Sequence, residues 1–96
     1  MQNERFLELV QTATAQQVQK AIDEGADPDA RNEQGRTPLM YAVAVNHDPE
    51  MIIALLKAGA DATAKDGDGK TAFDYARRNN EMKGTDAYEK LRDAVR

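Results

Sequence analysis

The segment at residues 64–71, Ala-Lys-Asp-Gly-Asp-Gly-Lys-Thr, fits a relaxed form of a phosphate-binding loop. In such a loop, backbone N–H groups and the lysine surround a phosphate, and a helix begins directly afterwards. Asp66 and Asp68 argue against this chemistry because they place negative charge where the phosphate would lie. The preceding residues 60–63 also lack the apolar side chains of a buried strand. A nucleotide-binding switch built on Lys70 is therefore the most remote functional hypothesis for this chain.

The other reactive residue types do not form a recognisable catalytic or metal site. A calcium loop that began at Asp66 would need a glutamate at its twelfth position, where the chain has Arg77. His47 is the only histidine and there is no cysteine, so we expect His47 at the surface and no zinc site. The chain has no serine or cysteine nucleophile, and no pair of carboxylates stands out as an acid and base. We therefore predict a protein that is not an enzyme and needs neither a cofactor nor a metal.

Composition narrows the classes of partner and the compartment. With 13 basic and 17 acidic residues among 96, the net charge is −4, which disfavours binding to nucleic acid or to an anionic membrane. No apolar run approaches the roughly 18 residues of a membrane-spanning helix. The first residues, Met-Gln-Asn-Glu-Arg, do not resemble a signal peptide. We predict a cytoplasmic monomer, with a processed secreted or periplasmic chain as the alternative.

Two separate strings of residues recur in this chain with the same period. Residues 35–42, Gly-Arg-Thr-Pro-Leu-Met-Tyr-Ala, return 34 residues later as Gly-Lys-Thr-Ala-Phe-Asp-Tyr-Ala at 69–76. Gly-Ala-Asp at residues 25–27 returns at 59–61 with the same offset. A shared period in two strings indicates an internal structural repeat.

Each repeat has the local signals of a helical hairpin. Thr37 is a suitable N-cap, because its hydroxyl can accept a free N–H of the first helical turn, and Pro38 suits the first helical position. Ten-residue connections rich in Asp, Asn and Gly separate the helix pairs at residues 26–35 and 60–69. A longer polar turn is predicted at residues 79–85. The expected helices cover about residues 4–12, 14–24, 38–45, 50–58, 71–78 and 87–95.

The second helices of the three units differ in how much of their surface is apolar. The helices at 14–24 and 87–95 have one narrow apolar stripe, whereas the helix at 50–58 is apolar nearly all round. A helix of the latter kind must be covered on every side. We therefore expect one domain over residues 1–96 that forms a complete stack of three layers. The layers are residues 3–34 as N-terminal capping repeat, 35–68 as central repeat and 69–96 as C-terminal capping repeat.

The order helix, turn, helix, then a Gly-Ala-Asp loop leading into Gly-x-Thr-Pro-Leu resembles the ankyrin repeat. The resemblance implies an all-α solenoid of helix-turn-helix units with short β-hairpin loops, whose tips would lie at about residues 32–34 and 67–68. The chain departs from the family pattern where Met40 and Asp74 replace the usual histidine and Ala72 replaces the proline. We expect the extra residue of the 34-residue period in the turn at residues 46–49.

The resemblance implies a protein–protein interaction module, because ankyrin-like proteins bind through the hairpin tips and the exposed face of each first helix. Carried over position by position, the partner-binding residues would be Arg31, Glu33, Gln34, Arg36, Val45, Lys65, Asp68, Lys70 and Arg78. Their mixed charges favour a protein partner over a polyanion. An acidic inhibitor or immunity-type protein that neutralises a basic toxin or enzyme is the runner-up, and self-association through a lid helix is a third hypothesis. Tyr41 and Tyr75 lie one period apart, and we expect them in the core or at the groove edge rather than in an aromatic ligand box.

Overall fold

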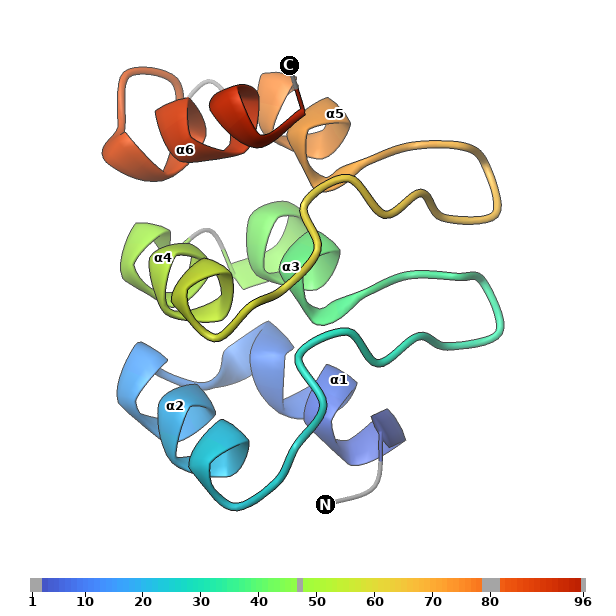
Figure 1. The fold of residues 1–96 in the computed structure, drawn as a ribbon, viewed down its shortest axis with the longest axis vertical. Helices are drawn as coiled ribbons and strands as arrows, with labels where there is room; N and C mark the ends of the chain where they lie inside the picture. The colour runs from blue at the N-terminus through green and yellow to red at the C-terminus, as the bar shows by residue number, and fades with distance from the viewer. Residues whose placement is uncertain (1–2, 47, 79–81, 96) are drawn as a thin grey trace.

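The fold is a stack of three helix pairs (Figure 1). One projecting loop connects the first pair to the second, and another connects the second pair to the third. The computed structural model describes residues 3–46, 48–78 and 82–95, and this part of the chain contains helices and turns but no strand. The first helices of the pairs stack on one another and so do the second helices, with the loops projecting on one side. The elements are α1 (Asn3–Thr12), α2 (Ala15–Asp23), α3 (Pro38–Tyr41), the π-helical turn η1 (Ala42–Asn46), α4 (Pro49–Lys57), α5 (Ala72–Arg77) and α6 (Asp86–Ala94).

Side-chain caps fix where the helices begin, as the sequence predicts. The Thr37 hydroxyl accepts a hydrogen bond from the backbone N–H of Met40 at 3.3 Å, and Pro38 fills the first helical position. Thr71 caps α5 in the same way, and Asp74 completes a capping box by accepting from the backbone N–H of Thr71 at 2.9 Å. Asp74, which stands where the family has histidine, therefore stabilises the start of its own helix.

The helix that follows Pro38 contains one wide turn that the sequence did not predict. Residues Ala42–Asn46 form a π-helix, a turn that holds an additional residue compared with the α-helix. The sequence places the extra residue of the 34-residue period in the turn at residues 46–49, at the end of this π-helical turn, and that placement stays a prediction. His47, predicted as a surface residue of that turn, lies outside the described residues.

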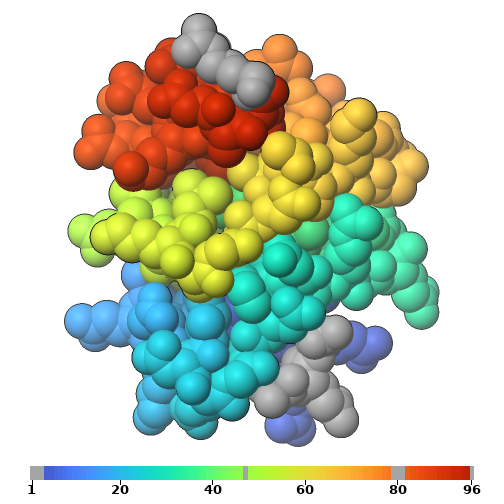
Figure 2. Space-filling view, in the orientation of Figure 1, coloured from blue at the N-terminus to red at the C-terminus, as the bar shows by residue number. Residues whose placement is uncertain are grey.

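The core lies between the stacked helices and is made of small and aliphatic side chains. Phe6, Leu39, Met51, Ile52 and Leu55 are fully buried, and Figure 2 shows the successive layers in direct contact. In the middle layer, α4 contacts both α2 and α6.

Two details of the packing differ from the sequence-based expectation. The helix α4 is not covered on every side, because Ile53 and Leu56 remain only partly buried. Met82, which falls in the predicted polar turn, is buried instead and packs into the core.

The connecting loops fold into two tight hairpins with turns at residues 33–34 and 67–68, where the sequence placed the tips. Each hairpin closes through backbone hydrogen bonds across its turn, such as Gly35 N–H to the Asn32 carbonyl at 2.9 Å, rather than through paired strands among the described residues. The Gly67 N–H also donates to the Gln34 carbonyl at 2.8 Å and ties the second hairpin to the first. The hairpins are therefore held to each other as well as to their own helices.

Candidate functional site

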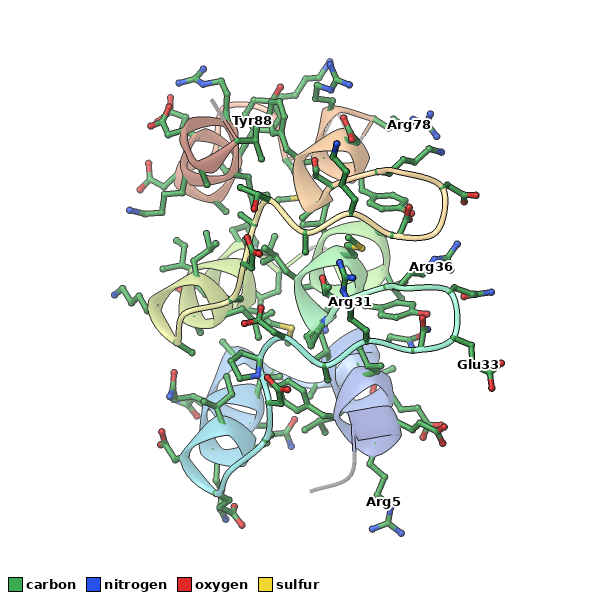
Figure 3. All side chains as sticks on the ribbon, turned by 45° about the vertical axis from the view of Figure 1, so that its right-hand side comes forward. Arg5, Arg31, Glu33, Arg36, Arg78 and Tyr88 are labelled. Carbon is green, nitrogen blue, oxygen red and sulfur yellow. The ribbon has the colours of Figure 1, made fainter. Side chains whose placement is uncertain are left out.

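The predicted partner-binding residues occupy the hairpins and the helix ends beside them. Arg31, Glu33 and Gln34 are exposed on the first hairpin, and Lys65 and Asp68 are exposed on the second. Figure 3 shows Glu33, Arg36 and Arg78 projecting on the hairpin side of the stack, and Val45 and Arg78 are exposed near the C-terminal ends of their helices. Most of the predicted set therefore lies on one side of the molecule.

The two cations at the base of the hairpins lie against tyrosine rings. The guanidinium carbon of Arg36 lies 5.9 Å from the centroid of the Tyr41 ring, and Lys70 Nζ lies 5.9 Å from the centroid of Tyr75. Such cation–π contacts are typically worth about 0.5–1 kcal/mol at exposed sites. A hydrogen bond with Tyr41 is the main reason why the pKa of Arg36 is raised above its ordinary value. The two pairs are one repeat apart, and each places a positive group beside a tyrosine ring.

The hairpins are shaped by two side chains, Asn32 and Asp66, whose structural role was not predicted from the sequence. Asn32 Oδ1 accepts from the backbone N–H groups of Gln34 and Arg36, both at 3.0 Å. Asp66 is only 7% exposed, and its Oδ1 accepts from the backbone N–H groups of Asp68 and Lys70 on the second hairpin. The common spacing of nine residues from Asn32 to Tyr41 and from Asp66 to Tyr75 is the sequence signal that could have revealed this arrangement.

A hydrogen bond links Asp66 to Tyr75 and affects both groups. The Tyr75 hydroxyl donates to Asp66 Oδ2, and this bond is the main reason why the pKa of Asp66 is lowered. Burial, together with the same hydrogen bond, raises the pKa of Tyr75. Asp66 is therefore a carboxylate and Tyr75 a neutral donor at neutral pH, and neither is poised for proton transfer.

The loop with the phosphate-binding pattern uses its own N–H groups internally. The N–H of Gly67 donates to Gln34, that of Gly69 to the Asp66 carbonyl, and those of Asp68 and Lys70 to the Asp66 side chain. A phosphate would have to displace these bonds and then meet the Asp66 carboxylate. The geometry therefore argues against nucleotide binding through the Lys70 loop. Within the described ranges no group of three or more His, Cys, Asp or Glu residues is placed to hold a metal ion.

Two hollows lie beside the hairpins on the face of the first helices. The larger one, about 290 Å³, lies between α1 and the first hairpin. Its lining residues are Glu4, Leu7, Glu8, Gln11, Asn32, Glu33, Gln34 and Tyr41. The smaller one, about 110 Å³, is lined by Arg36, Met40, Tyr41, Ala44, Val45 and Tyr75. The two tyrosines thus lie at the edge of a groove, which is one of the two positions predicted for them.

Comparison with known proteins agrees with the repeat pattern. Residues 22–76 match the family model described as "Ankyrin repeats (many copies)". The chain is 39% identical over 61 residues to human "Ankyrin repeat and SOCS box protein 6", which covers 58% of the chain and 14% of that protein. It is 36% identical over 73 residues to human "SH3 and multiple ankyrin repeat domains protein 1", covering 75% of the chain and 3% of that protein.

A third similarity is to bovine "Mitochondrial disaggregase", with 38% identity over 61 residues, 64% of the chain and 9% of that protein. The chain therefore spans only a small part of the length of each of these relatives. In the part of the chain that the structure describes, no helix is both long and apolar enough to cross a membrane.

Proposed function

Because the chain belongs to the ankyrin-repeat family, we propose that it is a non-catalytic module that binds another protein through its hairpin tips and the adjoining faces of its first helices. Ankyrin repeats are generally protein–protein interaction modules. The observation that most supports the proposal is that the hairpins are exposed and yet internally fixed. A binding surface that is already ordered loses less conformational entropy when a partner binds.

Three bonds between the hairpin regions support this view of a preformed surface. The Arg31 guanidinium donates to the Lys65 carbonyl at 2.8 Å, and the Asp61 N–H donates to Asp29 Oδ1 at 2.7 Å. The bond from Gly67 to Gln34 joins the two tips directly. Arg31 has a structural role here, so a test of partner binding should leave it unchanged.

The experiment is capture of a partner from a lysate of the source cell by the immobilised full chain, with mass spectrometry as readout. The tip variant combines Glu33→Lys with Lys65→Glu, which reverses two exposed charges and leaves the net charge unchanged. The outer-face variant combines Glu24→Lys, at the C-cap of α2, with Lys57→Glu, the last residue of α4; both residues are exposed. The helices α2 and α4 lie on the side of the stack opposite the hairpin tips (Figure 1). Thermal unfolding of each variant confirms that it is folded before the capture is compared.

We expect a protein that the wild type and the outer-face variant both capture and that the tip variant loses. A partner retained by the tip variant and lost by the outer-face variant would move the binding surface to the second helices. Failure of all three folded proteins to capture any partner would count against the binding-module function itself.

An acidic inhibitor of a basic protein is the second candidate, and the larger hollow favours it. Glu4, Glu8 and Glu33 line that hollow together, and the chain has a net charge of −4. Attraction between opposite charges would accelerate the encounter with a basic partner. The association rate with the captured partner should then fall steeply as salt is added, and a rate independent of salt would remove this candidate.

We further propose that the chain acts as a monomer in the cytoplasm, with the self-associating domain as the competing hypothesis. Light scattering over a range of protein concentrations separates the two. A mass that stays at that of one chain supports the monomer, and a mass that rises with concentration supports self-association.

A further inference from the structure

The two hollows adjoin at Tyr41, which lines both of them. The larger hollow lies between α1 and the first hairpin, and the smaller one reaches Tyr75 on α5. Lys70 lies beside this end, since its Nζ is 5.9 Å from the centroid of the Tyr75 ring. We call the two adjoining hollows, together with Lys70, the groove, and residues from all three repeats contribute to it.

One end of the groove is acidic. The larger hollow is lined by the carboxylates of Glu4, Glu8 and Glu33, with no cation among its described lining residues. Arg5, the basic residue of α1, points away from the stack (Figure 3), and the side chain of Arg31 bonds to the Lys65 carbonyl. The three carboxylates are therefore not neutralised by these neighbouring cations.

The other end of the groove is basic. Lys70 lies over Tyr75, and Arg78 projects from the end of α5 on the same side as Arg36 (Figure 3). Two of the acidic groups near this end are engaged, because Asp66 accepts three hydrogen bonds and Asp74 pairs with Arg77 at 2.9 Å.

Asp68 at the turn of the second hairpin is an exposed carboxylate, and several cations lie close to it in the sequence. Lys65 on the same hairpin is exposed as well, and Lys70 and Arg78 follow it. The charge of the groove thus changes from negative at α1 to positive at α5.

The middle of the groove is lined mainly by apolar side chains, with Arg36 as its one cation among the described lining residues. Val45 is 46% exposed and is the exposed large hydrophobic residue of the described chain. It lines the smaller hollow together with Met40, Ala44 and the two tyrosine rings. Placing an aliphatic side chain here would be favourable because apolar surface would be removed from water.

We propose that this groove binds an extended segment of the partner protein with a fixed order of side chains. A lysine or arginine of the segment occupies the acidic hollow, an aliphatic side chain lies over Val45, and an aspartate or glutamate faces Lys70 and Arg78. The opposite charges at the two ends set the direction of the segment, because the reversed direction would bring like charges together. This proposal rests on the proposed function and specifies the chemistry of its partner.

The test is selection of random dodecapeptides displayed on phage against the immobilised full chain. Three proteins are compared after thermal unfolding confirms that they fold: the wild type, a groove variant and Val45→Asp. The groove variant carries Glu4→Lys, Glu8→Lys, Lys70→Glu and Arg78→Glu, so its two ends exchange charge while the net charge is unchanged. The outer-face variant defined above is the control for altered surface charge.

We expect peptides selected on the wild type to share a basic, an aliphatic and an acidic residue in one order, and those selected on the groove variant to show the charges exchanged. Wild-type peptides should bind at least about tenfold more weakly to the groove variant and to Val45→Asp, and unchanged to the outer-face variant.

Peptides without a common charge order, or with equal affinity for all four proteins, would overturn the proposal, as would the absence of any selected peptide. In those cases a partner that the tip variant loses would still support the proposed function, so the two failures are distinguishable.

Discussion

Asn32 and Asp66 hold the same position in successive hairpins and bind equivalent groups, although one is an amide and the other a carboxylate. In both residues Oδ1 accepts from the backbone N–H groups two and four positions further along the chain. The remaining side-chain atom meets a tyrosine hydroxyl in both cases, but with opposite polarity. Asn32 Nδ2 donates to Tyr41 at 2.7 Å, whereas Asp66 accepts from Tyr75.

The first prediction is that Asp66 tolerates an amide far better than an alanine. Asp66→Asn should lower the free energy of unfolding by less than about 1 kcal/mol, because Asn32 demonstrates that an amide can make all three bonds. Asp66→Ala removes every acceptor and should cost about 1–3 kcal/mol. Urea unfolding at pH 7 measures both, and equal losses for the two variants would contradict the equivalence of the two positions.

The second prediction concerns the dependence of stability on pH. Hydrogen bonds lower the pKa values of Asp61, Asp66 and Asp74, with donors from Thr63, Tyr75 and Thr71 as the respective main causes. The unfolded state therefore takes up protons before the folded state does as the pH falls. The stabilisation is complete above the unfolded aspartate pKa of about 3.9 and is lost as the pH falls further through the folded values.

Urea unfolding between pH 7 and pH 3 should accordingly reveal a decrease in stability below about pH 4. The decrease should be shallower in Asp66→Asn, which has lost one of the three groups. Glu24→Gln removes an exposed carboxylate and serves as the control. A wild-type profile that rises toward low pH would be inconsistent with the lowered pKa values.

Most of the fold was predictable because its signals are local. The threonine caps and the proline of the Thr37–Pro38 pair act on the turn that directly follows them, and the observed helices begin within about a residue of the predicted positions. The glycine-containing hairpin turns were placed correctly for the same reason. Such features depend only on a few residues that are neighbours in the sequence, so they can be predicted without knowledge of the tertiary contacts.

The features that the sequence did not reveal depend on contacts between layers. The Asn46 side chain reaches α1, and Met82 is buried in the core that all three layers share. The π-helical turn at Ala42–Asn46 is not marked by a local motif in the sequence. The acidic hollow combines Glu4 and Glu8 of α1 with Glu33 of the first hairpin, so it exists only in the stacked structure.

The third prediction is that Asn46 joins the first two layers. Its Nδ2 donates to the carbonyl oxygens of Val10 and Ala13, both at 2.9 Å, near the C-terminal end of α1. Carbonyl groups in the last turn of a helix have no partner within the helix and need one from elsewhere. Asn46→Ala should therefore lower the free energy of unfolding by about 1–3 kcal/mol.

Urea unfolding measures this loss of stability as well. The control is Gln16→Ala at an exposed position of α2, which should change the free energy of unfolding by less than about 0.5 kcal/mol. If Asn46→Ala were as neutral as the control, the bonds to α1 would contribute no net stability.

The last prediction separates the strain of a left-handed glycine from the close approach of the two hairpins. Gly35 and Gly69 are equivalent positions with φ angles of 76° and 79°, where a side chain costs roughly 1 kcal/mol or more. A Cβ atom on Gly35 would lie 3.0 Å from the Gly67 nitrogen, whereas one on Gly69 would have no neighbour within 4 Å. Gly35→Ala must therefore also displace the second hairpin, including the N–H that Gly67 donates to Gln34.

Both alanine variants should be less stable than the wild type, and Gly35→Ala should lose about 1 kcal/mol or more beyond Gly69→Ala, comparable to one backbone hydrogen bond. Hydrogen exchange provides a second readout, since the Gly67 amide should exchange faster in Gly35→Ala and remain unchanged in Gly69→Ala. Equal destabilisation with an unchanged Gly67 amide would mean that the hairpins are not in contact in solution. The preformed surface assumed for partner binding would then be lost as well, because the bond between the tips is part of what holds it.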